Sequence, residues 1–206
     1  MYYNIGNKYE GEWKNDVKEG KGIMHYNNGN KYEGEWKNDD KEGKGIFYYK
    51  SGNKYEGEYI DNIRKNGTYI FLNGNKYIGE FNDKRNGKGV FYYNNGNKYE
   101  GNFVEDKREG HGEMSYFNGD KYKGNWVNNK KEGKGIYYYK DGSRYEGDFE
   151  DDMRSGEGII YYADRNKIIG EFLKGEILKE KRIIIDKDWN IVKDDDEDGD
   201  DDDERY

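Results

Sequence analysis

Residues 31–49 read KYEGEWKNDDKEGKGIFYY, and this stretch decides the fold. In its first half Tyr32, Gly34 and Trp36 alternate with two glutamates. Its second half has the form G-x-[apolar]-x-[aromatic] and ends at Tyr49. Alternation with a period of two is typical of half-buried strands, and no stretch of the chain shows the 3.6-residue period of a helix. The stretch therefore predicts two β-strands.

The same pattern recurs along the chain with a period of 22 to 23 residues. Its five-residue core reads YEGEW twice and then YEGEY, YIGEF, YEGNF, YKGNW, YEGDF and IIGEF. All eight cores have glycine third and an aromatic residue fifth, and they begin at Tyr9, Tyr32, Tyr55, Tyr77, Tyr99, Tyr122, Tyr145 and Ile168. Seven second segments follow and end at Tyr26, Tyr49, Phe71, Tyr93, Tyr116, Tyr139 and Tyr162. We therefore expect stacked copies of one supersecondary unit.

Glycine dipeptides separate one copy from the next. They read N-G, S-G or D-G and place glycine at positions 29, 52, 74, 96, 119 and 142. Glycine supplies the positive φ that a tight hairpin turn requires. Gly6 belongs to the same series, so residues 1–8 are predicted to end an earlier, truncated repeat that caps the array.

One face of the predicted sheet combines large rings with bare glycines. Glycine in a strand is costly unless something must approach the backbone closely, so we expect rings to lie over the glycines. Such a surface is predicted to curl into a trough that binds a partner. The candidate groove residues are Tyr9, Trp13, Tyr26, Tyr32, Trp36, Tyr49, Tyr55, Tyr59, Tyr77, Phe81, Tyr93, Tyr99, Phe103, Tyr116, Tyr122, Trp126, Tyr139, Tyr145 and Phe149.

The opposite face is predicted to be charged. A basic column is formed by Lys8, Lys31, Lys54, Lys76, Lys98, Lys121, Arg144 and Lys167. An acidic column lies two residues further on, at Glu10, Glu33, Glu56, Glu100 and Glu146. Exposed pairs of opposite charge contribute little stability but keep a face soluble. About 16 strands spaced by about 4.8 Å would make a twisted ribbon roughly 75 Å long.

The composition excludes several classes of protein. The 206 residues include no cysteine, so the chain has no disulfide, thiolate zinc site or cysteine nucleophile. The longest aliphatic run is Ile183–Ile185, far below the roughly 18 apolar residues of a membrane span. Residues 1–20 do not resemble a signal peptide. We expect a soluble, cytosolic protein.

The acidic charge is concentrated at the C-terminus. The whole chain has a formal net charge of −8, of which residues 194–206 carry −9 and the remaining residues +1. A run of like charge cannot bury apolar surface, so 194–206 is predicted to be a disordered acidic tail. Asp194 and Gly199 fit an EF-hand loop, but Arg205 replaces its final glutamate, so we expect no specific calcium site.

The repeat unit resembles the MORN repeat (membrane occupation and recognition nexus), whose pattern joins a YEG-[DE]-[WF] strand to a G-x-G strand. The resemblance implies an all-β fold, an elongated single-layer antiparallel sheet of stacked β-hairpins. It divides the chain into a repeat array (1–172), a C-terminal cap (173–193) and the acidic tail (194–206). The third copy departs from the pattern, with Lys65 and Asn66 before Gly67, and the eighth has Ile168 in place of tyrosine.

The motifs of common enzymes are not found in the sequence. His25 and His111, the two histidines, fall in different repeats, and we expect both to be exposed. No Gly-Lys is followed by Ser or Thr, as a Walker loop requires. Nucleic acid is not an expected partner, because the basic column has acidic neighbours and the tail would repel phosphate. We expect no enzyme activity, no cofactor and no metal.

The resemblance implies a non-catalytic scaffold or adaptor that binds a helical or extended segment of a partner protein, or a second copy of itself, through the aromatic groove. Two alternatives remain open, a peripheral membrane protein that binds phosphoinositides and an axonemal radial-spoke head subunit, whose layout of repeats and acidic segment is similar. Richness in Asn, Lys and Ile without proline suits a protist, in which proteins of this family lie in the cortical cytoskeleton. The expected location is therefore cytoplasmic, in the cytoskeleton or the membrane-associated cortex.

Overall fold

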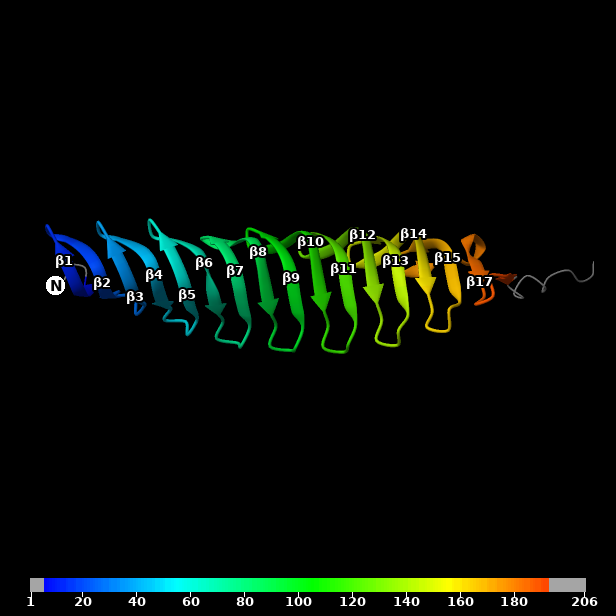
Figure 1. Cartoon of the computed structure of the whole chain (residues 1–206), viewed down its shortest axis with the longest axis horizontal. Helices are drawn as coiled ribbons and strands as arrows, with labels where there is room; N and C mark the ends of the chain where they lie inside the picture. Colours follow the sequence, from blue (N-terminus) through cyan, green and yellow to red (C-terminus); the bar gives the residue numbers. More distant parts are fainter. Residues whose placement is uncertain (1–5, 193–206) are drawn as a thin grey trace, which may run out of the picture. The chain divides into compact units, whose positions relative to one another are not determined.

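The computed structural model describes residues 6–192 of the chain (Figure 1). The predicted disordered tail (194–206) lies outside the described residues, as do residues 1–5 of the predicted truncated repeat and residue 193 of the predicted cap.

The described residues form 18 β-strands of one antiparallel sheet. The strands are β1 (Lys8–Lys14), β2 (Val17–His25), β3 (Lys31–Lys37), β4 (Asp40–Tyr48), β5 (Lys54–Ile60), β6 (Ile63–Ile70), β7 (Lys76–Asn82), β8 (Lys84–Tyr92), β9 (Lys98–Val104), β10 (Lys107–Ser115), β11 (Lys121–Val127), β12 (Lys130–Tyr138), β13 (Arg144–Glu150), β14 (Met153–Tyr161), β15 (Lys167–Leu173), β16 (Glu176–Ile177), β17 (Ile183–Ile185) and β18 (Ile191–Val192). The one helical element among residues 6–192 is the short 3-10 helix η1 (Lys179–Lys181). The predicted all-β fold of stacked hairpins is confirmed.

The sheet divides into two compact units. Of the described residues, the first unit holds 6–117 together with 126–129, and the second holds 118–125 and 130–192. In the first unit each strand from β1 to β9 pairs with the next one along the chain. In the second unit β12 to β15 pair in the same way, and β15 also pairs with β16 and β17.

The central glycines of neighbouring strands lie directly opposite one another. Gly34 pairs with Gly22 on one side and with Gly45 on the other. A Cβ atom added at Gly34 would lie 2.5 Å from the Cα of Gly45 and 2.5 Å from the hydroxyl oxygen of Tyr32. Real Cβ atoms do not come this close, so the tyrosine ring reaches its place only because both strands have glycine there. The prediction that rings lie over the glycines is confirmed.

Two kinds of turn join the strands. Between copies, Gly29 has a φ of +87° and its amide donates to the carbonyl of Tyr26, as expected from the glycine dipeptides. Within a copy, the turn between β3 and β4 consists of Asn38 and Asp39, both with positive φ. Asparagine and aspartate tolerate this region better than most side chains, and two such residues make the tight type I′ hairpin turn. The sequence pattern gave no sign of this second turn, since it lies inside a polar stretch without glycine.

A β-bulge follows the tight turn in most hairpins. Between β3 and β4 the register shifts from Gly34↔Gly45 to Trp36↔Lys41, which leaves additional residues on β4. Gly43 lies in this bulge with a φ of +64°. The bulge places Lys41 opposite Trp36, so its cation lies on the face of the rings. The polar stretch that contains Lys41 does not alternate, so the sequence did not predict which face this lysine would occupy.

Candidate functional site

The inner ring row is the set of buried aromatic residues at the first and fifth positions of the repeated core. Thirteen of the nineteen predicted groove residues belong to it and are buried: Tyr9, Tyr32, Trp36, Tyr55, Tyr59, Tyr77, Phe81, Tyr99, Phe103, Tyr122, Trp126, Tyr145 and Phe149. Their rings meet edge to face, as between Tyr32 and Trp36, whose centroids are 5.1 Å apart at an interplanar angle of 88°. Tyr32 makes a second such contact with Tyr59 of the next copy. Rings therefore form the core, with contacts that favour edge-to-face geometry.

The tyrosines at the first position of the core donate their hydroxyls to backbone carbonyls three residues further along the chain. The hydroxyl of Tyr55, for example, donates to the backbone carbonyl of Glu58 at 3.0 Å. Burial raises the pKa of Tyr55 to about 12, because the phenolate would be poorly solvated at this position. The same cause raises the pKa of Tyr77 and of Tyr145 to about 12. These tyrosines are neutral structural groups at physiological pH.

A cation from the start of each second strand lies among the rings. These residues are Lys18, Lys41, Arg64, Arg85 and Arg108 in the first unit and Lys131 and Arg154 in the second. Lys41 lies 5.7 Å from the ring centroid of Tyr32 and 5.4 Å from that of Phe47. Burial lowers the pKa of Lys41. This cation column contributes cation–π contacts to the core.

The outer ring row is the set of aromatic residues that end the second segments. It contains Tyr26, Tyr49, Phe71, Tyr93 and Tyr116 in the first unit and Tyr139 and Tyr162 in the second. Tyr49 and Tyr93 are partly exposed, and both pack beside a ring two residues earlier, Tyr49 against Phe47 at 4.6 Å and Tyr93 against Phe91 at 4.5 Å. Five residues of this row are among the nineteen predicted groove residues. These five and Trp13 are the six predicted groove residues that are partly exposed. Phe71 and Tyr162 occupy the same position of the repeat and were omitted from the predicted groove.

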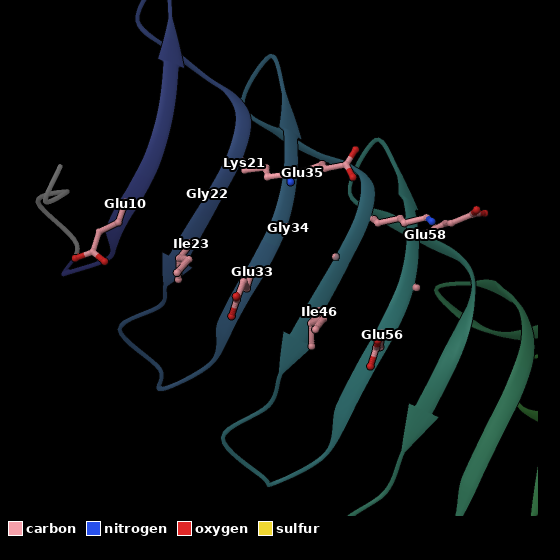
Figure 2. A pocket seen from close by; sticks show the side chains of 13 residues that line it. Glu10, Lys21, Gly22, Ile23, Glu33, Gly34, Glu35, Ile46, Glu56 and Glu58 are labelled. Carbon is pink, nitrogen blue, oxygen red and sulfur yellow. The ribbon is translucent and has the colours of Figure 1, made fainter.

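A hollow of about 670 Å³ lies on the face opposite the rings, in the first unit. Figure 2 shows two rows of side chains beside it, one with Ile23, Glu33 and Ile46 and the other with Lys21 and Glu35. The main chain at the paired glycines forms the floor between the rows. None of the nineteen predicted groove residues lines this hollow. The rings fill their own face by stacking, so the hollow is on the face where we predicted only a charged surface.

The charged columns of this face form ion pairs along β1, β3, β5, β9 and β13. Lys31 Nζ lies 3.2 Å from Glu33, and Lys54 Nζ lies 2.8 Å from Glu56. Lys31 also lies 4.2 Å from the ring centroid of Tyr48, which projects from the same face. His25 and His111 are both exposed, as expected. The basic column is therefore occupied by intramolecular contacts.

Residues 6–192 contain no cluster of three or more histidine, cysteine, aspartate or glutamate side chains that could hold a metal ion. No helix in that range has the length and hydrophobicity to cross a membrane.

The repeat profile that matches this chain is that of the MORN repeat. It matches residues 9–31, 32–54, 77–98, 99–121, 122–144 and 145–167. The chain belongs to the MORN-repeat family. The third copy, which lacks one paired glycine, and the eighth, which begins with Ile168, lie outside the six matches. A search of curated proteins found no match.

Solved structures share the fold at low sequence identity. One is the TCP domain of SAS-4 (dCPAP) of Drosophila melanogaster in complex with a proline-rich motif of Ana2 (dSTIL), with 14% identity, a TM-score of 0.50, and coverage of 84% of this chain and 87% of that chain. Another is the TCP10 domain of Danio rerio CPAP in complex with a STIL peptide, with 12% identity, a TM-score of 0.55, and coverage of 93% of this chain and 90% of that chain. At this identity the likeness is one of fold.

Proposed function

We propose that this MORN-repeat chain is a non-catalytic scaffold that binds a helical or extended segment of a partner protein, or a second copy of itself, through its ring face. The observation that carries the proposal is the outer ring row. It repeats a partly exposed aromatic side chain in each copy along a face whose inner rings are already buried. Contiguous apolar surface of this kind marks interaction sites more often than a scattered exposed ring does.

Two lines of support come from the relatives. The resemblance of this chain's motifs to MORN repeats implies a scaffold, and two of the solved structures that share this fold hold a bound segment of another protein. We also propose a location in the cytoplasm, in the cytoskeleton or the membrane-associated cortex. The cap at residues 173–193 and the boundary at 172 belong to the same proposal, with β15 pairing to β16 and β17 as support.

The buried and exposed rings have different parts in this proposal. Trp36 and Trp126 are 5% and 1% exposed, so truncating them would disturb the core before it tested a binding site. Tyr49 and Tyr93 keep exposed surface and end their second segments, where a partner could reach them. The binding residues that we propose are therefore the outer ring row and Trp13, supported from below by the inner ring row.

The test compares two pairs of tyrosines. Cross-linking in lysate of the source cells, followed by mass spectrometry, identifies a partner segment, which is then made as a peptide. We expect Tyr49→Ala with Tyr93→Ala to weaken its binding at least tenfold, since aromatic anchors dominate such interfaces. Tyr48→Ala with Tyr92→Ala is the matched control, because these neighbours project from the opposite face toward Lys31 and Lys76. Equal binding by both double variants would refute the ring face as the site.

Phosphoinositide binding is the less well supported alternative. It depends on the basic column, whose members Lys31, Lys54 and Lys98 each lie beside a glutamate of their own strand that would repel a phosphate headgroup. It predicts retention on phosphoinositide vesicles above the level on neutral vesicles, and the absence of that difference would exclude it.

A further inference from the structure

The hollow opposite the rings is lined by a pattern that only part of the array carries. The first three copies have glutamate on both sides of the core glycine, as Glu10-Gly11-Glu12, Glu33-Gly34-Glu35 and Glu56-Gly57-Glu58. The next three copies read Ile-Gly-Glu, Glu-Gly-Asn and Lys-Gly-Asn at the same place. The hollow spans these first three copies, and the seventh copy has the related sequence Glu146-Gly147-Asp148.

The lining alternates between two kinds of strand. Acidic strands with the E-G-E sequence flank β2 and β4, which contribute Lys21-Gly22-Ile23 and Lys44-Gly45-Ile46. In the register of the sheet Ile23 lies opposite Glu33, and Ile46 lies opposite both Glu33 and Glu56. Figure 2 shows this acid and aliphatic row running across the strands. A ligand that follows the row therefore meets a carboxylate and then an apolar side chain, once in each repeat.

The charge of the lining favours a basic ligand. Five of its seven charged side chains are carboxylates, those of Glu10, Glu33, Glu35, Glu56 and Glu58. Lys21 and Lys44 are the other two and lie opposite Glu35 and Glu58. Outside the lining, Lys8, Lys31 and Lys54 pair with the glutamates of one row, and these exposed pairs are weak enough for a ligand to replace. Two carboxylates on one strand lie about 7 Å apart, and a guanidinium between them can donate hydrogen bonds to both.

The pitch of the repeat selects the conformation of the ligand. Two strands separate equivalent residues of successive copies, a distance of about 9.6 Å. A polyproline II segment presents the same face every three residues, or about 9.3 Å. An α-helix returns to nearly the same face after seven residues, or about 10.5 Å. Its mismatch with the spacing of successive copies is roughly three times that of a polyproline II segment. A β-strand repeats its face after about 6.8 Å and does not match.

The main chain of the sheet points to the same conformation. The glycines whose main chain lines the hollow lie within β2 to β5, each of which pairs with a neighbouring strand on both sides. These main-chain groups already bond to neighbouring strands, so few of them are left to bond to a ligand in the β conformation. A polyproline II segment needs none from its partner, because its own main chain stays solvated.

We propose that this hollow is a second binding surface, which takes a polyproline II segment of a partner protein carrying arginine or lysine at every third position. The segment crosses strands β1 to β5, with its basic side chains between the paired glutamates and its intervening apolar residues over Ile23 and Ile46. The surface is separate from the ring face, so it goes beyond the scaffold function proposed above.

The test uses synthetic peptides and the full chain. We expect a blocked peptide of four Pro-Pro-Arg units to bind at least tenfold more tightly than a peptide of the same composition with its arginines in one block. Both peptides have the same charge, so the difference reports spacing alone. Equal affinity would overturn the proposal, because simple attraction between charges would then explain the binding. Tighter binding of a helical peptide of equal charge would also overturn it, and would leave the scaffold function standing.

Variants assign the binding to a face. Glu33→Lys with Glu56→Lys exchanges exposed side chains and is expected to reduce binding of the Pro-Pro-Arg peptide at least tenfold. Glu105→Lys with Glu150→Lys makes the same change of charge at exposed positions outside the hollow and is expected to leave binding within twofold. If Tyr49→Ala with Tyr93→Ala abolishes peptide binding and Glu33→Lys with Glu56→Lys does not, the peptide lies on the ring face and the second surface is refuted.

Discussion

Tyr48 and Tyr49 are neighbours in the sequence and lie on opposite faces of the sheet. Tyr48 packs beside the ammonium of Lys31, while Tyr49 packs against Phe47 and accepts a hydrogen bond from Arg64 at 3.1 Å. Alternation with a period of two was enough to assign these faces from the sequence. It was not enough to separate the buried Tyr32 from the partly exposed Tyr49, because both project from the ring face. They differ in position, since Tyr32 lies over the paired glycines and Tyr49 lies just beyond the end of β4.

The cation column shows a second limit at the residue scale. Lys41 lies in a polar stretch, where one lysine among charged neighbours carries no sign of burial. Its place among Tyr32, Phe47 and Tyr59 depends on the tight turn and the bulge that precede the paired glycines. Neither feature has a strong sequence signal, so the column becomes visible only in the structure.

Replacing a central glycine tests the packing of the inner ring row. In Gly45→Ala the new methyl group would overlap the ring of Tyr32, which two strands hold in place. We expect a loss of about 1–3 kcal/mol in the free energy of unfolding, the usual cost of overpacking a core. Lys44→Ala, at the exposed neighbouring position, should stay within about 0.5 kcal/mol of the wild type. Urea unfolding measures both, and equal stability of the two variants would contradict this packing.

The buried tyrosines predict a loss of stability at alkaline pH. Burial raises the pKa of Tyr55, Tyr77 and Tyr145 from 10.0 to about 12. The unfolded chain therefore ionises first, and the stability that these residues contribute is complete below pH about 10 and is lost between about 10 and 12. Urea unfolding at several pH values, with tyrosinate followed by ultraviolet absorbance, measures this effect. A free energy of unfolding that stays constant from pH 9 to 12 would contradict it.

At the scale of the element, each hairpin is tied to the next by a side chain in its tight turn. The carboxylate of Asp39 accepts a hydrogen bond of 3.0 Å from the backbone amide of Lys18, which lies one copy earlier in the chain. Asn62 and Asn129 do the same for Lys41 and Arg108. The strands themselves were predictable from alternation and from the glycine turns. The tight turns were not, because their Asn and Asp residues resemble any other polar connection.

Two substitutions at position 39 test this link between hairpins. Asp39→Ala removes the acceptor and the ion pair with Lys18, and places alanine at a φ of +73°. We expect it to cost about 1–3 kcal/mol, since a lost hydrogen bond costs about 1 and the strained backbone adds to it. Asp39→Asn keeps the acceptor and copies Asn62, so it should lose less than half as much. Thermal unfolding compares the two, and equal losses would refute the role of the acceptor.

At the scale of the whole molecule, the chain repeats one hairpin and varies its surface. The repeat period and the paired glycines predicted the all-β array and its family, since those residues determine the packing. The location of the hollow could not be predicted, because it depends on how the two faces are filled. Rings cover the paired glycines on one face, while the main chain of the same glycines lines a hollow on the other face, in the first unit and again in the second. Function then depends on which face a partner occupies.

Photo-cross-linking from two adjacent positions tests the central claim most directly. A photoreactive phenylalanine derivative replaces Tyr93 in one variant and Tyr92 in another, and each is expressed in the source cells. The ring face predicts that position 93 cross-links to one defined segment of a protein and that position 92 does not. Cross-links to that protein from position 92 alone, or to lipid from either position, would contradict the proposed scaffold function.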